Sequence, residues 1–481
     1  MVFPALLLFV FSAHALDNAV GQVPPLGFCV WQSYNRFINE RIIEESIDAL
    51  AKFRPYGYEY VNIDDAWMDA SRDPITNSLQ PNLITFPNGI KALADRAHSL
   101  DLKFGIYTAI GSQTCDRNQH PPDGDMENIG WGLPGDGPDN NPGSLNHYEI
   151  DAQAFADWGV DYVKIDDCQG YTADDGTSLS LYKQFTAALN QTGRPMYYVT
   201  CSLNPTSPAQ TNTPSATNRT YAYHVDVDGW REATRDISNG WFVEWVNNNN
   251  RFYRPDNGWS GSDGWLTTLD ANLDLGVASF SGPSSGGGAY ADMDAMSIGC
   301  NNASNVDPDT PTTAQNHSDC ANGRQSVAEQ QSQFSMWSMM SAPLMIGGDI
   351  RYMNEFNTPE IWKILTNTEI IDIDQDTKGE PASVVSYAPD DWSRTIGIYT
   401  KRLHDASRAV AVLNRGNFTE TVTVTVEMLR LDEDDITVPC STFSVRDLWK
   451  HEDVVESTTN EILYELEVET HETVVLKISC V

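Results

Sequence analysis

The sequence predicts an α/β protein, a (β/α)₈ barrel followed by a C-terminal antiparallel β-sandwich. Three observations carry this prediction. Short apolar segments alternate with helical segments from residue 26 to about 350, polar clusters follow several of the apolar segments, and the pattern changes to a period of two after about Thr377. Because repeated strand-helix-strand units form parallel sheets with crossover helices, the first region is typical of a barrel.

The expected barrel strands are short and apolar, and they cover residues 58–63, 102–107, 160–165, 196–201 and 343–346. Between them apolar residues recur at helical spacing, as at Ile43, Ile47 and Leu50. Polar pairs end several strands, at residues 64–65, 166–167 and 348–349. Barrel enzymes build their active sites at such strand ends. An open doubly wound sheet is the alternative, but it requires an early glycine-rich phosphate loop, which the sequence lacks.

The C-terminal region alternates apolar and polar residues, as at Val422, Val424 and Val426 and again at residues 474–478. This pattern indicates antiparallel strands with one buried face. We therefore expect the catalytic barrel over residues 16–376 and the β-sandwich over residues 377–481. Cys440 and Cys480 are candidates for a disulfide within the sandwich.

Residues 1–15 are expected to be a secretory signal peptide. An apolar run over residues 2–11 is followed by Ala13-His14-Ala15, a small-x-small cleavage pattern. The run is too short to span a membrane, and a buried N-terminal segment is the alternative. Five glycosylation sequons and eight cysteines also fit an oxidising compartment, with the sequons at Asn190, Asn218, Asn302, Asn316 and Asn417. The expected location is secreted, or the lumen of a lysosome or vacuole.

The formal net charge is −37, from 67 acidic and 30 basic residues. Such a charge repels phosphate backbones and anionic lipids, so nucleic acid and membrane surfaces are not expected partners. No second segment resembles a membrane span. Two polar stretches, residues 116–142 and 301–322, are expected to be long surface loops, and Cys300 and Cys320 could close the second.

Asp166 ends an expected strand, with Lys164 two residues before it, so both side chains point to the same side. An ammonium there would keep the carboxylate ionised, as a nucleophile requires. An ordinary ion pair at a strand end is the alternative. Asp64 and Asp65 follow another strand and suit sugar hydroxyls. They would also suit Ca²⁺ or Mg²⁺, but an Asp-x-Asp-x-Asp loop and a histidine pair are missing, so no metal or cofactor is expected.

Together the motifs resemble glycoside hydrolase family 27, the α-galactosidase and α-N-acetylgalactosaminidase group. The resemblance extends over nearly all of the mature chain. The matching segments are residues 31–37 (WQSYNRF), 60–67 (YVNIDDAW), 86–90, 102–107, 147–152, 158–168 (WGVDYVKIDDC), 291–294, 334–337, 342–344 and 373–376.

The resemblance implies a retaining exo-glycosidase that releases terminal α-linked D-galactose from oligosaccharides or glycoconjugates. It implies Asp166 as the nucleophile and Asp236 as the general acid/base. The residues that it implies for sugar binding are Tyr34, Asp64, Asp65, Tyr107, Lys164 and Arg231. It also implies a disulfide between Cys115 and Cys168 near the site.

The chain departs from the family pattern at several positions. Ala66 stands where the family usually has a bridged cysteine. Asp236 lies one residue farther from Arg231 than the pattern requires, which leaves Asp226 and Asp228 as other candidates for the acid/base. On spacing alone, Arg231 and Asp236 would also fit an ordinary surface pair.

Three questions stay open in the sequence. Ser202 occupies the position where the family's α-N-acetylgalactosaminidases carry serine, so that activity is an alternative to α-galactosidase. A catalytically inactive sugar-binding glycoprotein is a second alternative, since fold does not determine function. The pairing of Cys29 and Cys201 and the oligomeric state are undetermined, with a homodimer as one option.

Overall fold

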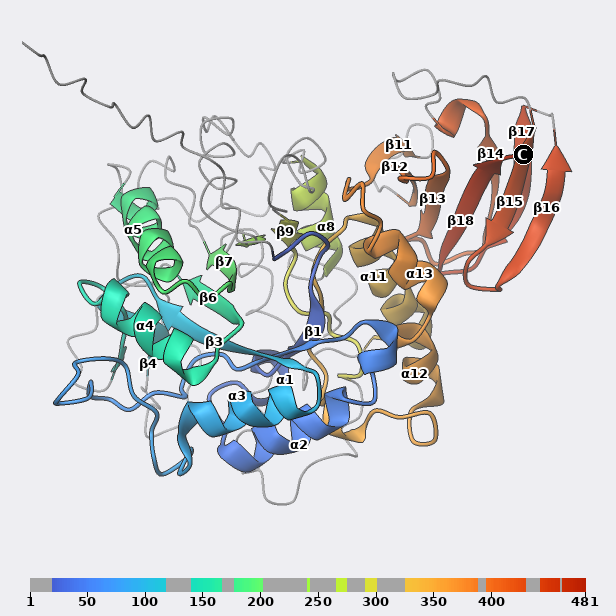
Figure 1. Ribbon diagram of the computed structural model, residues 1–481. Helices are drawn as coiled ribbons and strands as arrows, with labels where there is room; N and C mark the ends of the chain where they lie inside the picture. Colours follow the sequence, from blue (N-terminus) through green and yellow to red (C-terminus); the bar gives the residue numbers. More distant parts are fainter. Residues whose placement is uncertain are drawn as a thin grey trace, which may run out of the picture.

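The computed structural model describes residues 20–117, 140–166, 177–201, 240–242, 265–274, 290–300, 325–387, 395–429, 442–458 and 461–481. Figure 1 shows two regions beside each other, a parallel sheet with its helices and a C-terminal antiparallel region drawn in red. We call these the barrel and the β-region.

Among the described residues, the parallel sheet has eight strands in the order β10-β1-β2-β3-β6-β7-β8-β9. Their bounds are β1 Leu26–Cys29, β2 Tyr60–Asn62, β3 Lys103–Ala109, β6 Tyr162–Asp166, β7 Tyr197–Cys201, β8 Gly240–Phe242, β9 Tyr290–Asp292 and β10 Leu344–Ile346. Met296, just after β9, forms a parallel bridge with Ile346 of β10. Because this bridge joins the two outer strands, the sheet closes into a barrel.

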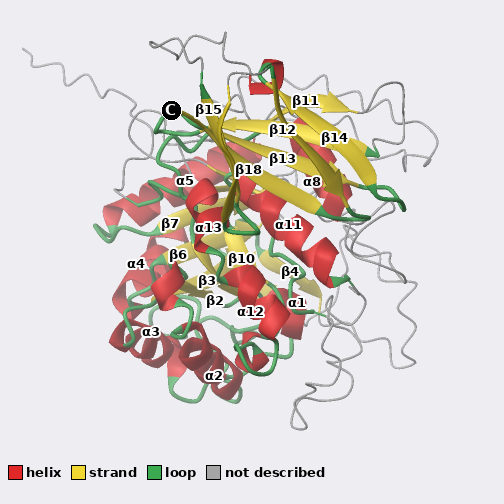
Figure 2. Ribbon diagram, turned by 90° about the vertical axis from the view of Figure 1, so that its right-hand side faces the viewer, coloured by secondary structure: helices red, strands yellow, loops and turns green. Residues whose placement is uncertain are grey.

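Helices follow most of the strands and cover the outside of the barrel (Figure 2). They are α1 Trp31–Tyr34, α2 Glu40–Leu50, α3 Gly89–Ser99, α4 Tyr148–Trp158, α5 Thr177–Gln191, α8 Trp265–Asp274, α11 Val327–Met339, α12 Pro359–Leu365 and α13 Thr368–Asp374. Short 3₁₀ turns occur at η1 Arg54–Tyr56, η4 Ile350–Tyr352 and η5 Glu427–Leu429, and β4 Gln113–Arg117 pairs antiparallel with β5 Asn140–Pro142.

Local sequence explains where these helices begin. The side chain of Asn39 accepts a hydrogen bond from the backbone N–H of Ile42, which caps α2. Ser326 and Glu329 form a capping box at the start of α11. The buried face of α2 contains Ile43, Ile47 and Leu50, as its helical periodicity predicted.

The β-region contains a six-stranded antiparallel sheet in the order β11-β12-β13-β18-β15-β16 and a two-stranded sheet, β14 with β17. The strands are β11 Ser383–Tyr387, β12 Ile396–Arg402, β13 Arg408–Asn414, β14 Glu420–Thr425, β15 Phe443–Asp447, β16 Glu452–Thr458, β17 Ile462–Val468 and β18 Thr473–Cys480. Val422 and Val424 of one sheet share an apolar core with Leu476 and Ile478 of the other. The predicted fold class, a barrel followed by a β-sandwich, is therefore confirmed.

Strand β13 joins the two regions, because both of its faces are buried. Val410 and Val412 point into the core of the β-region, whereas Ala409, Ala411 and Leu413 belong to the apolar cluster of the barrel. This division follows from the period of two along a strand. The apolar contact between barrel and β-region is thus continuous with the barrel's own core.

Candidate active site

The carboxyl ends of β2 and β6 gather three aspartates. Asp64 and Asp65 follow β2, and Asp166 is the last residue of β6. Strand β3 lies between them, with Tyr107 paired to Lys164 and Ala109 to Asp166. All three aspartates are buried, with exposed fractions of 4%, 1% and 8%. Carboxylates in such a position need a counter-charge or hydrogen-bond donors, because burial disfavours their charged form.

Lys164 supplies this counter-charge. Its Nζ lies 3.0 Å from Oδ2 of Asp64 and 3.8 Å from Oδ1 of Asp166. The ammonium also lies 5.5 Å from the centre of the Tyr107 ring. One lysine therefore bridges two carboxylates that are far apart in sequence. The predicted proximity of Lys164 to Asp166 is present, and the shorter contact is with Asp64.

Tyr107, on β3, lies near Lys164 and the aspartates. Burial raises the pKa of its phenol well above the usual value, and the nearby negative charge of Asp166 raises it further. The hydroxyl therefore stays protonated and able to donate a hydrogen bond. The backbone carbonyl of Tyr107 accepts a hydrogen bond of 2.8 Å from the indole of Trp67, which ties the ring's strand to the loop after β2.

A tight turn fixes the Asp64 side chain. The backbone N–H of Asp65 donates to Oδ1 of Asp64 at 2.9 Å, and that of Ala66 donates to Oδ1 of Asp65 at 2.7 Å. Ala66 has a φ of 70°, in the left-handed region that L-residues seldom adopt. Oδ2 of Asp64 is the atom that contacts Lys164.

Cys29, at the end of β1, carries a free thiol. Its Sγ lies 3.9 Å from Oδ2 of Asp64. Burial, followed by the Asp64 charge, raises the pKa of the thiol to about 12, so Cys29 stays protonated. The sequence left the pairing of this cysteine open and did not single it out as a site residue. Its position at the end of a barrel strand was the signal that could have done so.

Tyr34 lies in a different cluster. The residue is 3% exposed, and the Arg351 guanidinium carbon lies 5.1 Å from the centre of its ring. Arg351 also forms ion pairs of 2.8 Å with Asp349 and with Glu45 of α2. The structure places Tyr34 against this arginine, so its proposed place on the sugar face stays a prediction.

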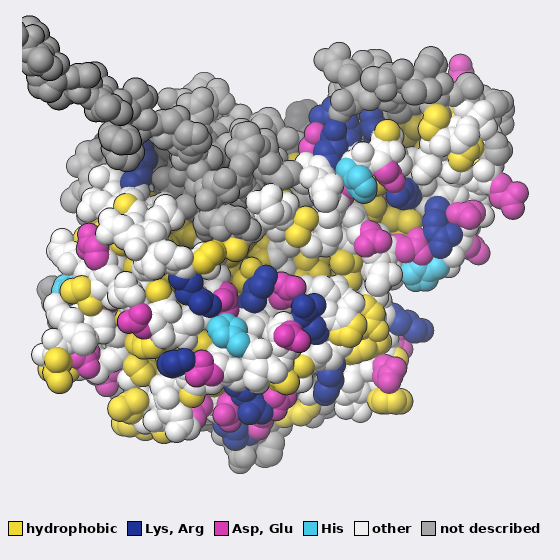
Figure 3. Space-filling view, viewed as in Figure 1, with side chains coloured by type: hydrophobic (Ala, Val, Ile, Leu, Met, Phe, Trp, Pro, Cys, Tyr) yellow, Lys and Arg dark blue, Asp and Glu magenta, His cyan; other side chains and the backbone are white. Residues whose placement is uncertain are grey.

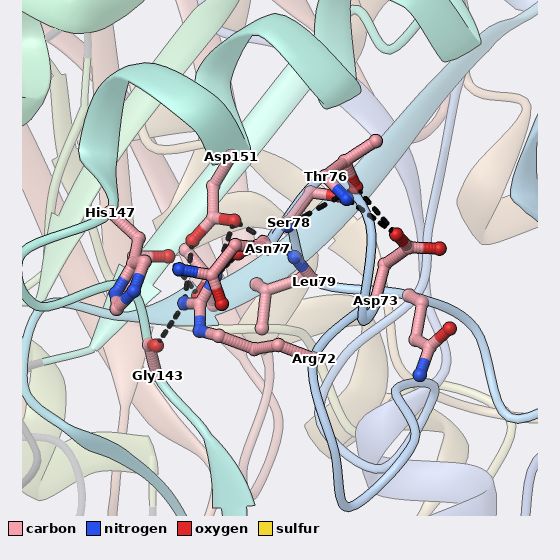
Figure 4. A network of polar contacts seen from close by, with 12 residues as sticks. Arg72, Asp73, Thr76, Asn77, Ser78, Leu79, Gly143, His147 and Asp151 are labelled. Carbon is pink, nitrogen blue, oxygen red and sulfur yellow. Dashed lines mark hydrogen bonds and ion pairs between the residues drawn. The ribbon is translucent and has the colours of Figure 1, made fainter.

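The loop after β2 is anchored on the barrel by Arg72 (Figure 4). Its guanidinium binds both carboxylate oxygens of Asp151 at 2.8 Å, and the Leu79 N–H donates to the same carboxylate at 2.9 Å. A bidentate pair of this kind has a defined geometry. Asp151, which lies in a motif that the sequence analysis matched, thus ties the loop after β2 to helix α4.

The end of β9 is held by α11. Asp294 donates its backbone N–H to Oδ1 of Asp292 at 2.8 Å, and its carbonyl accepts from the indole of Trp337 at 2.9 Å. Gln32, after β1, donates to the carbonyl of Ala295. These bonds connect the strand end nearest the closure of the barrel with helix α11.

Several predicted site residues lie outside the described residues: Asp236, Arg231, Ser202 and Cys168. Cys115 is disulfide-bonded. Within the described ranges, no group of three or more histidine, cysteine, aspartate or glutamate side chains is arranged to hold a metal ion. In the same ranges no helix is long and apolar enough to cross a membrane. Figure 3 shows acidic and basic side chains interspersed on the visible face.

The fold and the site define a class of protein, the (β/α)₈-barrel enzymes with acidic residues gathered at the carboxyl ends of the strands. Comparison with known proteins narrows this class. Residues 29–127 and 137–265 match a family described as alpha galactosidase A, and residues 393–478 match the alpha galactosidase C-terminal β-sandwich domain.

Curated relatives agree with these matches. An α-galactosidase from Oryza sativa subsp. japonica is 31% identical over 91% of this chain and 81% of the relative. Alpha-galactosidase 3 from Arabidopsis thaliana is 32% identical over 95% and 82%. The fold matches the α-galactosidase of Saccharomyces cerevisiae solved with raffinose, with a TM-score of 0.69, 21% identity and coverage of 96% and 98%. The chain belongs to the melibiase-type α-galactosidase family, glycoside hydrolase family 27.

Proposed function

We propose that this protein is a retaining exo-α-galactosidase, which releases terminal α-linked D-galactose from oligosaccharides or glycoconjugates. The observation that carries the proposal is Lys164, which bridges Asp64 and Asp166 at the ends of β2 and β6. One carboxylate can attack the sugar while the other binds its hydroxyls, and the lysine ammonium contacts both. The family relationship supports the substrate class.

In the proposed mechanism Asp166 attacks the anomeric carbon while Asp236 protonates the departing oxygen. Asp236 then removes a proton from water, which hydrolyses the glycosyl ester and leaves the α configuration unchanged. This scheme expects the two carboxyl groups to be about 5–5.5 Å apart. The negative charge of Asp166 would raise the pKa of Asp236, and esterification of Asp166 would lower it again.

The surroundings of Asp166 suit a nucleophile. Lys164 favours its ionised form, and the protonated Tyr107 hydroxyl is a hydrogen-bond donor beside it. Asp64, fixed by its turn and by Lys164, is suited to accept sugar hydroxyls. For the remaining positions the family resemblance supports sugar contacts by Tyr34, Asp65, Ser202 and Arg231.

Ser202 supports a second candidate activity, α-N-acetylgalactosaminidase. By the family pattern a serine there would leave room for a 2-acetamido group, whereas a single side-chain change alters selectivity by only about 1–3 kcal/mol. A catalytically inactive sugar-binding glycoprotein is the third candidate. Such a protein would bind galactosides but would not hydrolyse them.

The proposal includes the processing and assembly expected from the sequence. These are a signal peptide over residues 1–15, a catalytic domain over 16–376, a sandwich domain over 377–481, a Cys115–Cys168 disulfide, N-glycans, and a secreted or lysosomal/vacuolar location. A homodimer and the absence of nucleic-acid partners are part of the same proposal. Mass spectrometry of the mature protein, before and after glycan removal, tests the cleavage and modification.

The function is tested with nitrophenyl α-galactoside, its N-acetylgalactosamine analogue and the variant Asp166→Asn. We expect hydrolysis of the galactoside, with kcat lowered in the variant by a factor on the order of 10³ or more. NMR should detect α-galactose as the first product. Asp372→Asn, in α13, is the control and should keep wild-type turnover. Near wild-type turnover by Asp166→Asn, or β-galactose as first product, would contradict the proposal.

A further inference from the structure

The ion pairs between the barrel and the β-region all have the same orientation of charge. In every ion pair that the structure describes between the two, the β-region contributes the basic side chain and the barrel the carboxylate. The pairs are Arg415–Asp270, Arg446–Glu369, His404–Asp376, His451–Glu369 and His471–Glu329. The chain as a whole has a net charge of −37, so basic side chains are few compared with acidic ones. Several of them nevertheless lie on the β-region side of this boundary, opposite carboxylates of the barrel.

Three of the five pairs use a histidine. His404 Nδ1 lies 2.7 Å from Oδ2 of Asp376, His451 Nδ1 lies 2.7 Å from Oε1 of Glu369, and His471 Nδ1 lies 2.8 Å from Oε1 of Glu329. The histidines come from three turns, after β12, β15 and β17. Figure 3 shows histidine and acidic side chains together where the two regions meet. A histidine forms a full ion pair only when its ring is protonated.

The carboxylate partners of the three histidines lie on or next to helices α11 and α13. Glu329 lies in the first turn of α11, where it also closes the capping box, and Glu369 lies in the first turn of α13. Asp376 follows α13. Farther along α11, Trp449 donates its indole N–H to the Ser335 hydroxyl at 2.9 Å. The same helix binds the carbonyl of Asp294, at the end of β9, through Trp337.

We propose that His404, His451 and His471 form an acid-strengthened latch, which holds the β-region on helices α11 and α13 more firmly in mildly acidic than in neutral or alkaline solution. The three rings act together because their carboxylate partners all lie on or next to helices α11 and α13. The latch is independent of the catalytic assignment.

The direction of the pH effect follows from the charges that face each ring. His404 faces Asp376, with Asp405 and Lys477 nearby, and the hydrogen bond to Asp376 raises the pKa of His404 above its ordinary value. A raised pKa stabilises the folded state fully below about pH 6.5, and this contribution is lost as the pH rises through the folded-state value. His451 and Arg446 face Glu369, and His471 faces Glu329.

Protonation of Glu369 limits the effect at low pH, because a neutral carboxyl group no longer forms an ion pair. The pKa of Glu369 is lowered, first by the hydrogen bond from Arg446 and also by that from His451. A lowered carboxyl pKa keeps the pair intact in mild acid, and its contribution is lost as the pH falls through that lowered value. The shifts of His404 and Glu369 therefore both favour the mildly acidic range, each for its own ion pair.

Hydrogen exchange of the purified full-length protein tests the latch. The triple variant His404→Gln, His451→Gln, His471→Gln keeps a polar side chain of similar reach but cannot become charged. At about pH 5.5 we expect amides of residues 325–340 and 368–376 to exchange several-fold faster in the variant than in wild type, after correction for intrinsic rates. At about pH 8 the two proteins should exchange alike.

Two further variants make the outcome decisive. His98→Gln removes a matched pair inside the barrel, His98 with Asp161 at 2.7 Å, and should leave exchange of α11 and α13 unchanged. The triple substitution to arginine keeps positive charge at every pH, so at about pH 8 its α11 and α13 amides should show the protection, corrected for intrinsic rates, that wild type shows at about pH 5.5. Equal exchange of the glutamine variant and wild type at about pH 5.5, or an equal difference at both pH values, would overturn the proposal.

Discussion

The aspartate cluster at the strand ends and the boundary between the two regions each contain a lysine, and the surroundings of the two lysines differ. Lys164, in the aspartate cluster, contacts two carboxylates and keeps 25% of its side chain exposed. Lys401, on β12, is 1% exposed, and its Nζ donates to three oxygens that carry no net charge. These are the carbonyl of Ser338 at 3.0 Å, the hydroxyl of Ser341 at 2.7 Å and the carbonyl of Ile373 at 2.6 Å.

The difference shows what each environment does to a charge. Burial lowers the pKa of Lys401 to about 8, although Asp374 raises it in part, because carbonyl dipoles offset only some of the lost hydration. Asp374 is itself fully buried, and burial raises its carboxyl pKa well above the usual value. In the aspartate cluster, the ammonium of Lys164 contacts two carboxylates directly. Lys164 therefore brings charged groups together where the reaction is expected, whereas Lys401 connects α11 and α13 to β12 by hydrogen bonds.

The largest effect is expected for Lys164→Met. This change leaves Asp64 and Asp166 without their shared counter-charge, so the nucleophile is less readily ionised. We expect kcat/KM for nitrophenyl α-galactoside to fall by a factor on the order of 10²–10³, with an unchanged circular-dichroism spectrum. Lys103→Met is the control, because Lys103 lies at the other end of the neighbouring strand β3. A loss of under tenfold would show that the bridge does not serve catalysis.

Lys401→Met is expected to affect stability and not chemistry. The substitution leaves two carbonyls and one hydroxyl without their donor, which should cost about 1–3 kcal/mol in the free energy of unfolding. The folded-state pKa of Lys401 lies below the unfolded value, so the unfolded state binds more protons between them. The stability that this lysine contributes therefore rises with pH from about 8 to 10.5.

Chemical denaturation across that pH range measures the effect of Lys401→Met. The difference in unfolding free energy between wild type and variant should widen as the pH rises above about 8. Turnover in native buffer should stay close to wild type. A difference that is constant with pH would mean that Lys401 is not titrating in its buried position.

Tyr107→Phe removes the phenol hydroxyl next to the aspartate cluster and keeps the aromatic ring. Because the phenol is a donor beside the Asp166 carboxylate, we expect kcat to fall about tenfold, which corresponds to about 1.4 kcal/mol. The pH at which activity rises on the acid side should move upward, since Asp166 loses a donor that favours its charged form. If the pH dependence of activity on the acid side did not change, the hydroxyl would not act on the ionisation of Asp166. Tyr198→Phe, in the core of β7, is the matched control.

The smallest effect is expected for Cys29→Ala. The thiol is a weak donor, and its Sγ is 3.9 Å from Asp64. We expect KM to change by less than about threefold, with kcat retained. Cys29→Asp adds a fourth carboxylate to the three of the aspartate cluster and should lower kcat/KM by a far larger factor. Similar kinetics for the alanine and aspartate variants would show that the side chain at position 29 does not interact with the aspartate cluster.

The strand pattern predicted much of this arrangement. Asp64 and Asp166 follow apolar segments, and the carboxyl ends of parallel strands meet on one side of a barrel. The spacing of Lys164 and Asp166 also predicted that both point to the same side, and the structure places them 3.8 Å apart. In the β-region the period of two predicted that Val422 and Val424 are buried. Such patterns depend on neighbours in sequence, so they are visible without coordinates.

Other features depended on distant contacts. Tyr34 lies in a motif of the first region, yet its ring packs under Arg351, far along the chain. Lys401 stands in an alternating strand where lysine usually faces solvent, and only the packing of β12 on α11 and α13 buries it. The partners of His404, His451 and His471 are likewise set by how the β-region docks on the barrel.

The sequence by itself determined the two kinds of sheet, the strand ends that carry the aspartates and the family, because periodicity and motifs are local properties. Tertiary structure decided which charges meet, with Lys164 bridging two carboxylates, Lys401 bound by carbonyls and three histidines set against the carboxylates of α11, α13 and Asp376. The physical reason is that burial and electrostatic interaction depend on distance in space, which residue spacing alone does not specify.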